Sequence, residues 1–142
     1  HRSKSTMIEN INKRALQYVY NDYESPNEEL LKRNNSESFQ AMQIKSLVLE
    51  VYKCLYRISP KYLHNVFTPK ETSYCLRNNH LEQPKVNTVN YGLLSFHYHG
   101  AKVWNNLPTH MKYIDNIETF KSDLQSLRIS LCKCSFCNPC IV

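Results

Sequence analysis

The chain has 142 residues, which fits one domain, and its 18 Lys and Arg against 12 Asp and Glu give a formal net charge of +6. With only two glycines, it contains neither of the glycine-rich phosphate loops G-x-G-x-x-G and G-x-x-x-x-G-K-[ST]. Its apolar runs are too short for a transmembrane helix, and its first ten residues are polar and unlike a signal peptide. We therefore expect an intracellular protein with no membrane partner. Because the sequence begins at His1 and not at Met, we also expect a fragment of a longer reading frame.

The positive charge is spread along the chain. Residues 1–71 contain 11 basic and 8 acidic residues, and residues 72–142 contain 7 and 4. A basic chain attracts nucleic acid or another anionic partner over long range. The alternative is a solvated surface with surplus lysine, which requires no such partner.

The first helix is predicted over residues 6–20. Thr6 and Glu9 have the spacing of a capping box, in which each side chain accepts a hydrogen bond from a free backbone N–H group. Apolar residues recur at helical spacing over this segment, at Ile8, Ile11, Ala15 and Val19.

A second helix is predicted to begin at Ser25-Pro26. Ser25 can cap it, Pro26 suits its first position, and Glu28 completes a capping box. Leu30 and Leu31 lie within it. The helix should end near residues 34–35, because Asn tolerates the left-handed conformation found at helix ends.

The third predicted helix, over residues 36–58, has the clearest pattern. Ser36 can cap it, and Ser59-Pro60 should stop it and begin a short turn. A long apolar stripe with 3.6-residue spacing runs through Phe39, Ile44, Leu47, Val48, Val51, Leu55 and Ile58.

The rest of the chain, from residue 67, is predicted to begin with an irregular connector and to continue with helices. Residues 67–92 contain prolines and several asparagines, with short strands at residues 74–76 and 86–89. Apolar periodicity then returns from Leu93 to Leu107, and Asn116 can cap a last helix. The fold class is thus a small, mainly α domain of about five helices. We divide it into residues 1–66, an irregular connector 67–92, helices in 93–130 and a Cys-rich tail 131–142.

Four of the six cysteines lie in the last eleven residues, as Cys132-x-Cys134-x-x-Cys137-x-x-Cys140. Four thiolates can complete a tetrahedral zinc shell. Here one short segment would have to wrap the metal alone, and the alternative is a disordered, oxidation-prone tail. Cys54 lies in an apolar helical pattern and is interpreted as a small buried hydrophobe. Cys75 has no evident role.

Residues 83–114 contain no acidic residue, and basic and aromatic side chains alternate there. Such a pattern can follow a phosphate backbone and stack on bases. The alternative is that the aromatic residues are core, which we favour for Phe96 and Trp104 because they lie eight residues apart on one helix face. The candidate contacts are Lys85, Lys102, Lys112, Tyr91 and Tyr98.

No catalytic constellation is evident. The three aspartates, Asp22, Asp115 and Asp123, form no close pair in an apolar strand of the kind that two-metal chemistry uses. His97 and His99 form an H-x-H pair, but residues two apart on a helix do not face each other. The sequence thus shows no catalytic residues.

Several short motifs follow one another along nearly the whole chain. The first half contains Ser3-Lys4-Ser5, Ile8-Glu9-x-Ile11-x-Lys13-Arg14-Ala15-Leu16, Val19-Tyr20-Asn21-Asp22-Tyr23, Glu28-Glu29-Leu30-Leu31, Leu49-Glu50-Val51-x-Lys53 and Ser59-Pro60-x-Tyr62-Leu63. The second half contains Tyr91-Gly92, Trp104-Asn105-Asn106-Leu107-Pro108 and Phe120-Lys121 with Leu124. In order and spacing they resemble the C-terminal region of a non-LTR (LINE-type) retrotransposon reverse transcriptase.

This resemblance implies a parent RNA-directed DNA polymerase, often joined to an endonuclease, that acts in the nucleus. The family's catalytic aspartates lie in an [FY]-x-D-D motif that does not occur here, so magnesium would be bound only in the polymerase core. The resemblance implies a non-catalytic role: packing after the core and helping to hold template RNA or target DNA. Some members also end in C-x-C-x-x-C, but this tail departs from the C-x-x-x-C…H…C knuckle of others.

Two other functions remain open. The chain can be a standalone zinc-dependent nucleic-acid-binding module, or it can be a helical protein-interaction domain or a pseudogene remnant. The expected partners under the first hypothesis are the upstream polymerase core and RNA or DNA, with no small-molecule substrate.

Overall fold

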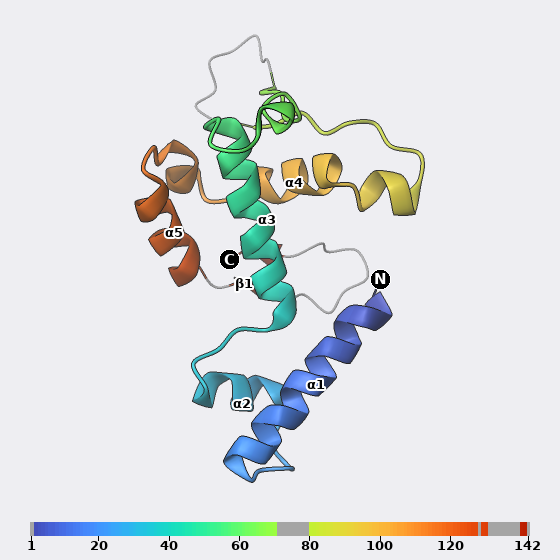
Figure 1. The fold of residues 1–142 in the computed structure, drawn as a ribbon, viewed down its shortest axis with the longest axis vertical. Helices are drawn as coiled ribbons and strands as arrows, with labels where there is room; N and C mark the ends of the chain where they lie inside the picture. The colour runs from blue at the N-terminus through green and yellow to red at the C-terminus, as the bar shows by residue number, and fades with distance from the viewer. Residues whose placement is uncertain (1, 71–79, 128, 131–139, 142) are drawn as a thin grey trace. The chain divides into compact units, whose positions relative to one another are not determined.

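The computed structural model describes the whole chain except residues 1, 71–79, 128, 131–139 and 142. The described part is mainly helical, as predicted, with five α-helices and three shorter helical turns (Figure 1). None of these helices combines the length and the apolar character that crossing a bilayer requires. The chain forms two compact units, residues 1–43 and 44–142. The division falls inside α3 (Phe39–Leu55).

The first unit contains the helical hairpin of α1 (Arg2–Tyr20) and α2 (Asn27–Arg33). Leu16 of α1 packs with Leu30 and Leu31 of α2, and these three leucines are its small core. Helix α1 begins earlier than predicted, so Thr6 lies inside the helix and does not cap it. The apolar stripe that predicted this helix is largely exposed: Ile11 is 65% and Val19 is 73% exposed.

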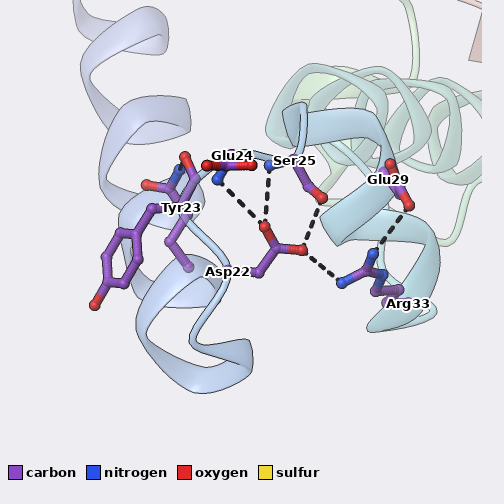
Figure 2. A network of polar contacts seen from close by, with 7 residues as sticks. Asp22, Tyr23, Glu24, Ser25, Glu29 and Arg33 are labelled. Atoms are coloured by element: carbon purple, nitrogen blue, oxygen red, sulfur yellow. Dashed lines mark hydrogen bonds and ion pairs between the residues drawn. The ribbon is translucent and has the colours of Figure 1, made fainter.

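The turn between α1 and α2 is organised around the carboxylate of Asp22 (Figure 2). This carboxylate accepts hydrogen bonds from the Ser25 hydroxyl at 2.7 Å, the Ser25 N–H at 3.0 Å and the Glu24 N–H at 3.3 Å. It also pairs with the Arg33 guanidinium at 2.7 Å, and Arg33 reaches Glu29 at 3.0 Å. The hydrogen bonds of Ser25, and after them Arg33 and Glu24, lower the pKa of Asp22 to about 2.

Two predicted helix caps are corrected by the structure. The N-cap position of α2 is Pro26, with no side-chain cap, because the Ser25 hydroxyl is engaged with Asp22. For α3, the cap is Ser38 and not Ser36: the Ser38 hydroxyl accepts a hydrogen bond from the Ala41 N–H at 3.2 Å. The predicted end of α2 is confirmed, since the helix stops at Arg33 and Asn35 has a positive φ of 48°.

The second unit is built on the C-terminal part of α3. Ile44, Val48 and Val51 of the predicted stripe are buried there and form a core face, whereas Ile58 is 53% exposed. Tyr52, which was not in the stripe, is buried beside them. The helix ends at Leu55, three residues before the predicted end, and Arg57 takes a positive φ of 57°. The short turn predicted after Ser59-Pro60 is confirmed as a 3₁₀ helix, η1 (Lys61–Leu63).

The connector that follows is irregular, as expected, but the strand predicted at residues 86–89 is wrong. Residues 86–88 have no regular structure, and Val89 begins a single π-helical turn, η2 (Val89–Leu93). The strand predicted at residues 74–76 lies outside the described residues. An isolated antiparallel β-bridge pairs Pro69 with Leu81.

Helix α4 (Phe96–Asn105) follows η2, and it begins where the Ser95 hydroxyl accepts a hydrogen bond from the Tyr98 N–H at 3.3 Å. After a 3₁₀ helix, η3 (Thr109–Tyr113), comes α5 (Ile117–Ser126). The predicted cap of α5 is confirmed: Asn116 Oδ1 accepts from the Glu118 N–H at 2.8 Å. The short strand β1 (Ile129–Ser130) was not predicted from the sequence, and it pairs antiparallel with β2 (Cys140–Ile141).

Helices α4 and α5 both pack on α3 (Figure 1). At the contact with α4, a Cβ atom on Gly100 would lie 2.8 Å from Phe67 and 2.9 Å from Val51, so only glycine fits there. At the contact with α5, the rings of Tyr52 and Phe120 stack with centroids 4.1 Å apart. The expectation that Trp104 is core is confirmed, since it is 2% exposed, and Phe96 packs partly buried against the same core.

Candidate nucleic-acid interface

Two of the five candidate contact residues lie on the segment that leads into α4. Lys85 is exposed, and Tyr91 is 91% exposed. Their backbones are held near each other because Val86 packs on Gly92, where an added Cβ would lie only 2.7 Å from the Val86 Cβ. Gly92 is therefore required for the close approach that brings the neighbours Lys85 and Tyr91 into one region.

Two further candidates share one face of α4. Tyr98 and Lys102 are four residues apart on the helix, so their side chains emerge on the same side, and both are half-buried. Helix α4 contacts η2, which carries Tyr91. Burial, and then the nearby ammonium of Lys102, lower the pKa of His99, so His99 is neutral at pH 7 and adds no charge.

The fifth candidate, Lys112, lies in a different environment. It is only 4% exposed, and its ammonium donates a hydrogen bond to the Asn105 carbonyl at 2.9 Å. Asn105 is the last residue of α4, so Lys112 binds the negative end of the helix dipole. Burial lowers the pKa of Lys112. A side chain in this position serves the fold, and we leave Lys112 out of the exposed surface.

The remaining four residues define what we call the basic-aromatic surface: Lys85, Tyr91, Tyr98 and Lys102. Residues 83–114 contain no acidic residue, and among the described residues neither Lys85 nor Lys102 forms an ion pair. Two cations and two phenol rings on one stretch of chain can pair with phosphates and stack on bases.

The two histidines of the H-x-H pair lie on α4. His97 turns its ring edge toward Phe67, with centroids 5.9 Å apart and ring planes at 81°. The described residues contain no group of three or more His, Cys, Asp or Glu side chains placed to hold a metal ion. His97 and His99 are both partly buried.

Three of the candidate zinc ligands, Cys132, Cys134 and Cys137, lie outside the described residues, as does Cys75. The backbone of Cys140 belongs to β2, where it pairs with Ser130. Cys54 is 1% exposed, as predicted, and burial raises the pKa of its thiol, which keeps it protonated and unreactive.

One polar contact between α4 and the connector was not predicted from the sequence. The Asn105 side chain binds both backbone groups of Leu81: Oδ1 accepts from the Leu81 N–H at 2.7 Å, and Nδ2 donates to the Leu81 carbonyl at 2.9 Å. This amide thereby joins the end of α4 to the connector. The sequence feature that could have pointed to this contact is the Trp104-Asn105-Asn106-Leu107-Pro108 motif. Its Trp104 and Leu107 side chains are buried.

Comparisons with known proteins assign the chain to no family. No protein-family model matches the chain, and neither a curated protein nor a solved structure matches it.

Proposed function

We propose that the chain is a non-catalytic helical region that binds single-stranded RNA or DNA, and that it is the C-terminal region of a non-LTR retrotransposon reverse transcriptase. The observation that carries the binding proposal is the basic-aromatic surface. Lys85 and Tyr91 are exposed within an acid-free stretch of the sequence, and η2, which carries Tyr91, contacts α4.

The chemistry of this surface suits a single strand better than a duplex. Lys85 and Lys102 supply ammonium groups for phosphates, while the exposed ring of Tyr91 offers a face on which an unpaired base can stack. Bases inside a duplex are already stacked on each other and present only their edges. The proposal therefore predicts binding with little sequence preference.

The reverse-transcriptase part of the proposal is supported by the order of the short motifs along the chain. In the fold, the motif near residue 104 has a structural role: Trp104 and Leu107 are buried, and Asn105 binds the connector. The proposed partner is an upstream polymerase core, which would hold the magnesium and the catalytic aspartates. Sequencing the transcript upstream of His1 tests this: we expect an in-frame [FY]-x-D-D motif. An initiator Met preceded by stop codons would contradict it.

Binding is tested with the variant Tyr91→Ala and a fluorescent single-stranded RNA. Loss of one stacked base should weaken binding by about 1–3 kcal/mol, which is roughly five- to 150-fold. The matched control is Tyr62→Ala, because Tyr62 on η1 is also a strongly exposed tyrosine, at 79%. Equal affinities for Tyr91→Ala and the unchanged protein, measured by fluorescence anisotropy, would count against the stacking role.

A second candidate function is zinc binding by Cys132, Cys134, Cys137 and Cys140. The observation in its favour is the pairing of β1 with β2, which returns the backbone of Cys140 to that of Ser130, two residues before Cys132. Four cysteine thiolates are a complete ligand set for structural zinc. Elemental analysis of the purified chain should then find one zinc per molecule, lost in the double variant Cys134→Ser/Cys137→Ser. A metal-free chain with full RNA affinity would contradict it.

A further inference from the structure

The second unit contains a cavity of about 210 Å³ that the basic-aromatic surface does not include. Its walls are mostly apolar and aromatic, and they include Leu55, Leu81, Tyr56 and Trp104. Two groups in the lining carry a titratable nitrogen, His80 and Lys112. The volume is below the roughly 300–1,000 Å³ of sites for drug-sized ligands, so only a small molecule fits.

Lys112 is the unusual member of this lining. A buried ammonium is costly unless it is paired, and this side chain is 96% buried, since its exposure is 4%. Its three N–H groups have one acceptor among the residues that the structure describes, the Asn105 carbonyl. Within the same residues no carboxylate forms an ion pair with it. The dipole of α4 offsets part of the charge, and two N–H groups remain for another acceptor.

The charges around the cavity favour an anion. Burial lowers the pKa of His80, and the positive charges of Lys112 and Lys70 lower it further, so these groups are close enough to interact. Two acidic groups lie next to the lining among the described residues. Asp115 Oδ1 accepts a hydrogen bond from the Tyr56 hydroxyl at 3.3 Å, and Glu82, which follows Leu81, accepts one from the Thr68 hydroxyl at 3.2 Å. Burial, followed by the charge of Asp115, raises the pKa of Tyr56 to about 12, so this hydroxyl stays protonated and remains a donor to Asp115.

We propose that this cavity binds a small organic anion, with a carboxylate paired to Lys112 and a flat apolar body against Trp104 and Leu81. The carboxylate supplies the Lys112 ammonium with an acceptor besides the Asn105 carbonyl, and hydrogen bonds between charged groups are the strong ones. The apolar walls explain why the ligand would be an organic anion and not an inorganic one, whose remaining oxygens would be left without donors. A monocyclic aromatic carboxylate has the size and the shape that these walls accept.

The test uses benzoate as the probe and benzyl alcohol, which has the same ring without the charge, as its control. Trp104 is the only tryptophan of the chain and lines the cavity, so its fluorescence reports on this site alone. At constant ionic strength we expect a saturable change with benzoate, and at least about tenfold weaker binding of benzyl alcohol, because the alcohol lacks the charge-assisted bonds. Equal affinities for the two compounds, or no saturable change with benzoate, would overturn the proposal.

The variant Lys112→Met tests whether the preference for benzoate depends on the Lys112 ammonium. A methionine of similar length in an apolar site should be tolerated, and we expect the preference for benzoate over benzyl alcohol to disappear. The matched control Lys121→Met removes a lysine of α5 that does not line the cavity and should keep the preference. A preference that survives Lys112→Met contradicts the assignment. If this variant does not fold, the contrast between the two compounds on the unchanged protein still decides whether the cavity binds an anion.

Discussion

Asn105 shows how a single side chain can hold two segments together. Its amide replaces a strand partner for Leu81 by satisfying both the N–H and the carbonyl of that residue, which is itself 4% exposed. Buried backbone groups that lose their partners keep their full desolvation cost. The amide therefore matters more than an ordinary surface asparagine.

The variant Asn105→Ala should lower the free energy of unfolding by about 1–3 kcal/mol, because it leaves two backbone groups of Leu81 without partners. Its neighbour offers a matched control: Asn106 is exposed, and Asn106→Ala should change stability by less than about 0.5 kcal/mol. Urea denaturation followed by circular dichroism measures both. Similar losses for the two variants would show that the amide contacts of Asn105 carry no particular weight.

Asp22 gives a second prediction at the scale of the residue. Its pKa is lowered from 3.8 to about 2, so the folded protein holds this proton less tightly than the unfolded chain. The stability that Asp22 contributes is thus fully present above about pH 4 and is lost as the pH falls through 2. A carbon-detected NMR titration of the Asp22 carboxyl should give a midpoint near 2.

The causes of this shift can be separated by substitution. Ser25 contributes most, through its hydroxyl and its N–H, and Arg33 contributes less. Ser25→Ala should therefore raise the Asp22 midpoint toward 3.8 by more than Arg33→Gln does. A larger effect of the arginine variant would mean that the ion pair, and not the hydrogen bonds of the turn, sets the pKa.

At the scale of the element, Gly100 controls how closely α4 approaches α3. A Cβ at this position would overlap Val51 and Phe67, which are both buried. Overpacking of this kind costs roughly 1–3 kcal/mol, whereas Ala gains about 1 kcal/mol over Gly in a helix. We expect Gly100→Ala to lower the free energy of unfolding by about 1 kcal/mol on balance. An increase in the midpoint of urea denaturation would show that the two helices can move apart at little cost.

The predicted elements differ in how well local sequence could define them. The interior of α3 and the cap of α5 were predictable because each depends on near neighbours: an apolar repeat in one case, and Asn116 followed by free N–H groups in the other. The capping roles of Ser25 and Ser36 were not, since Ser25 is engaged by Asp22 and Ser38 caps α3 instead. The two-residue strands β1 and β2 are too short to show any alternation.

The candidate site shows the same limit. Lysine is normally exposed, so the sequence favoured Lys112 as a nucleic-acid contact. Its buried position at the end of α4 depends on the Asn105 carbonyl and on the turn of η3, which local sequence does not reveal. The cavity beside it joins residues from 55 to 112 and leaves no pattern in the sequence. By contrast, the exposure of Lys85 and Tyr91 follows from a polar, irregular connector, which the sequence did predict.

At the scale of the whole molecule, the two units differ in how much core they possess. Residues 44–142 enclose a core with Trp104, Tyr52 and Phe120, whereas the helical hairpin of residues 1–43 buries three leucines and leaves Ile11 and Val19 exposed. The basic-aromatic surface and the cavity both belong to the larger unit. We therefore expect the binding functions to depend on that unit.

The central claim is that Lys85 and Lys102 contact phosphates, and the salt dependence of RNA binding tests it most directly. Each contact with a single strand contributes about 0.7 to the slope of log affinity against log salt concentration. The double variant Lys85→Ala/Lys102→Ala should therefore bind single-stranded RNA with a slope shallower by about 1.4. The control Lys32→Ala/Lys61→Ala removes two exposed lysines elsewhere and should keep the slope of the unchanged protein. Equal slopes for the two double variants would contradict the proposed interface.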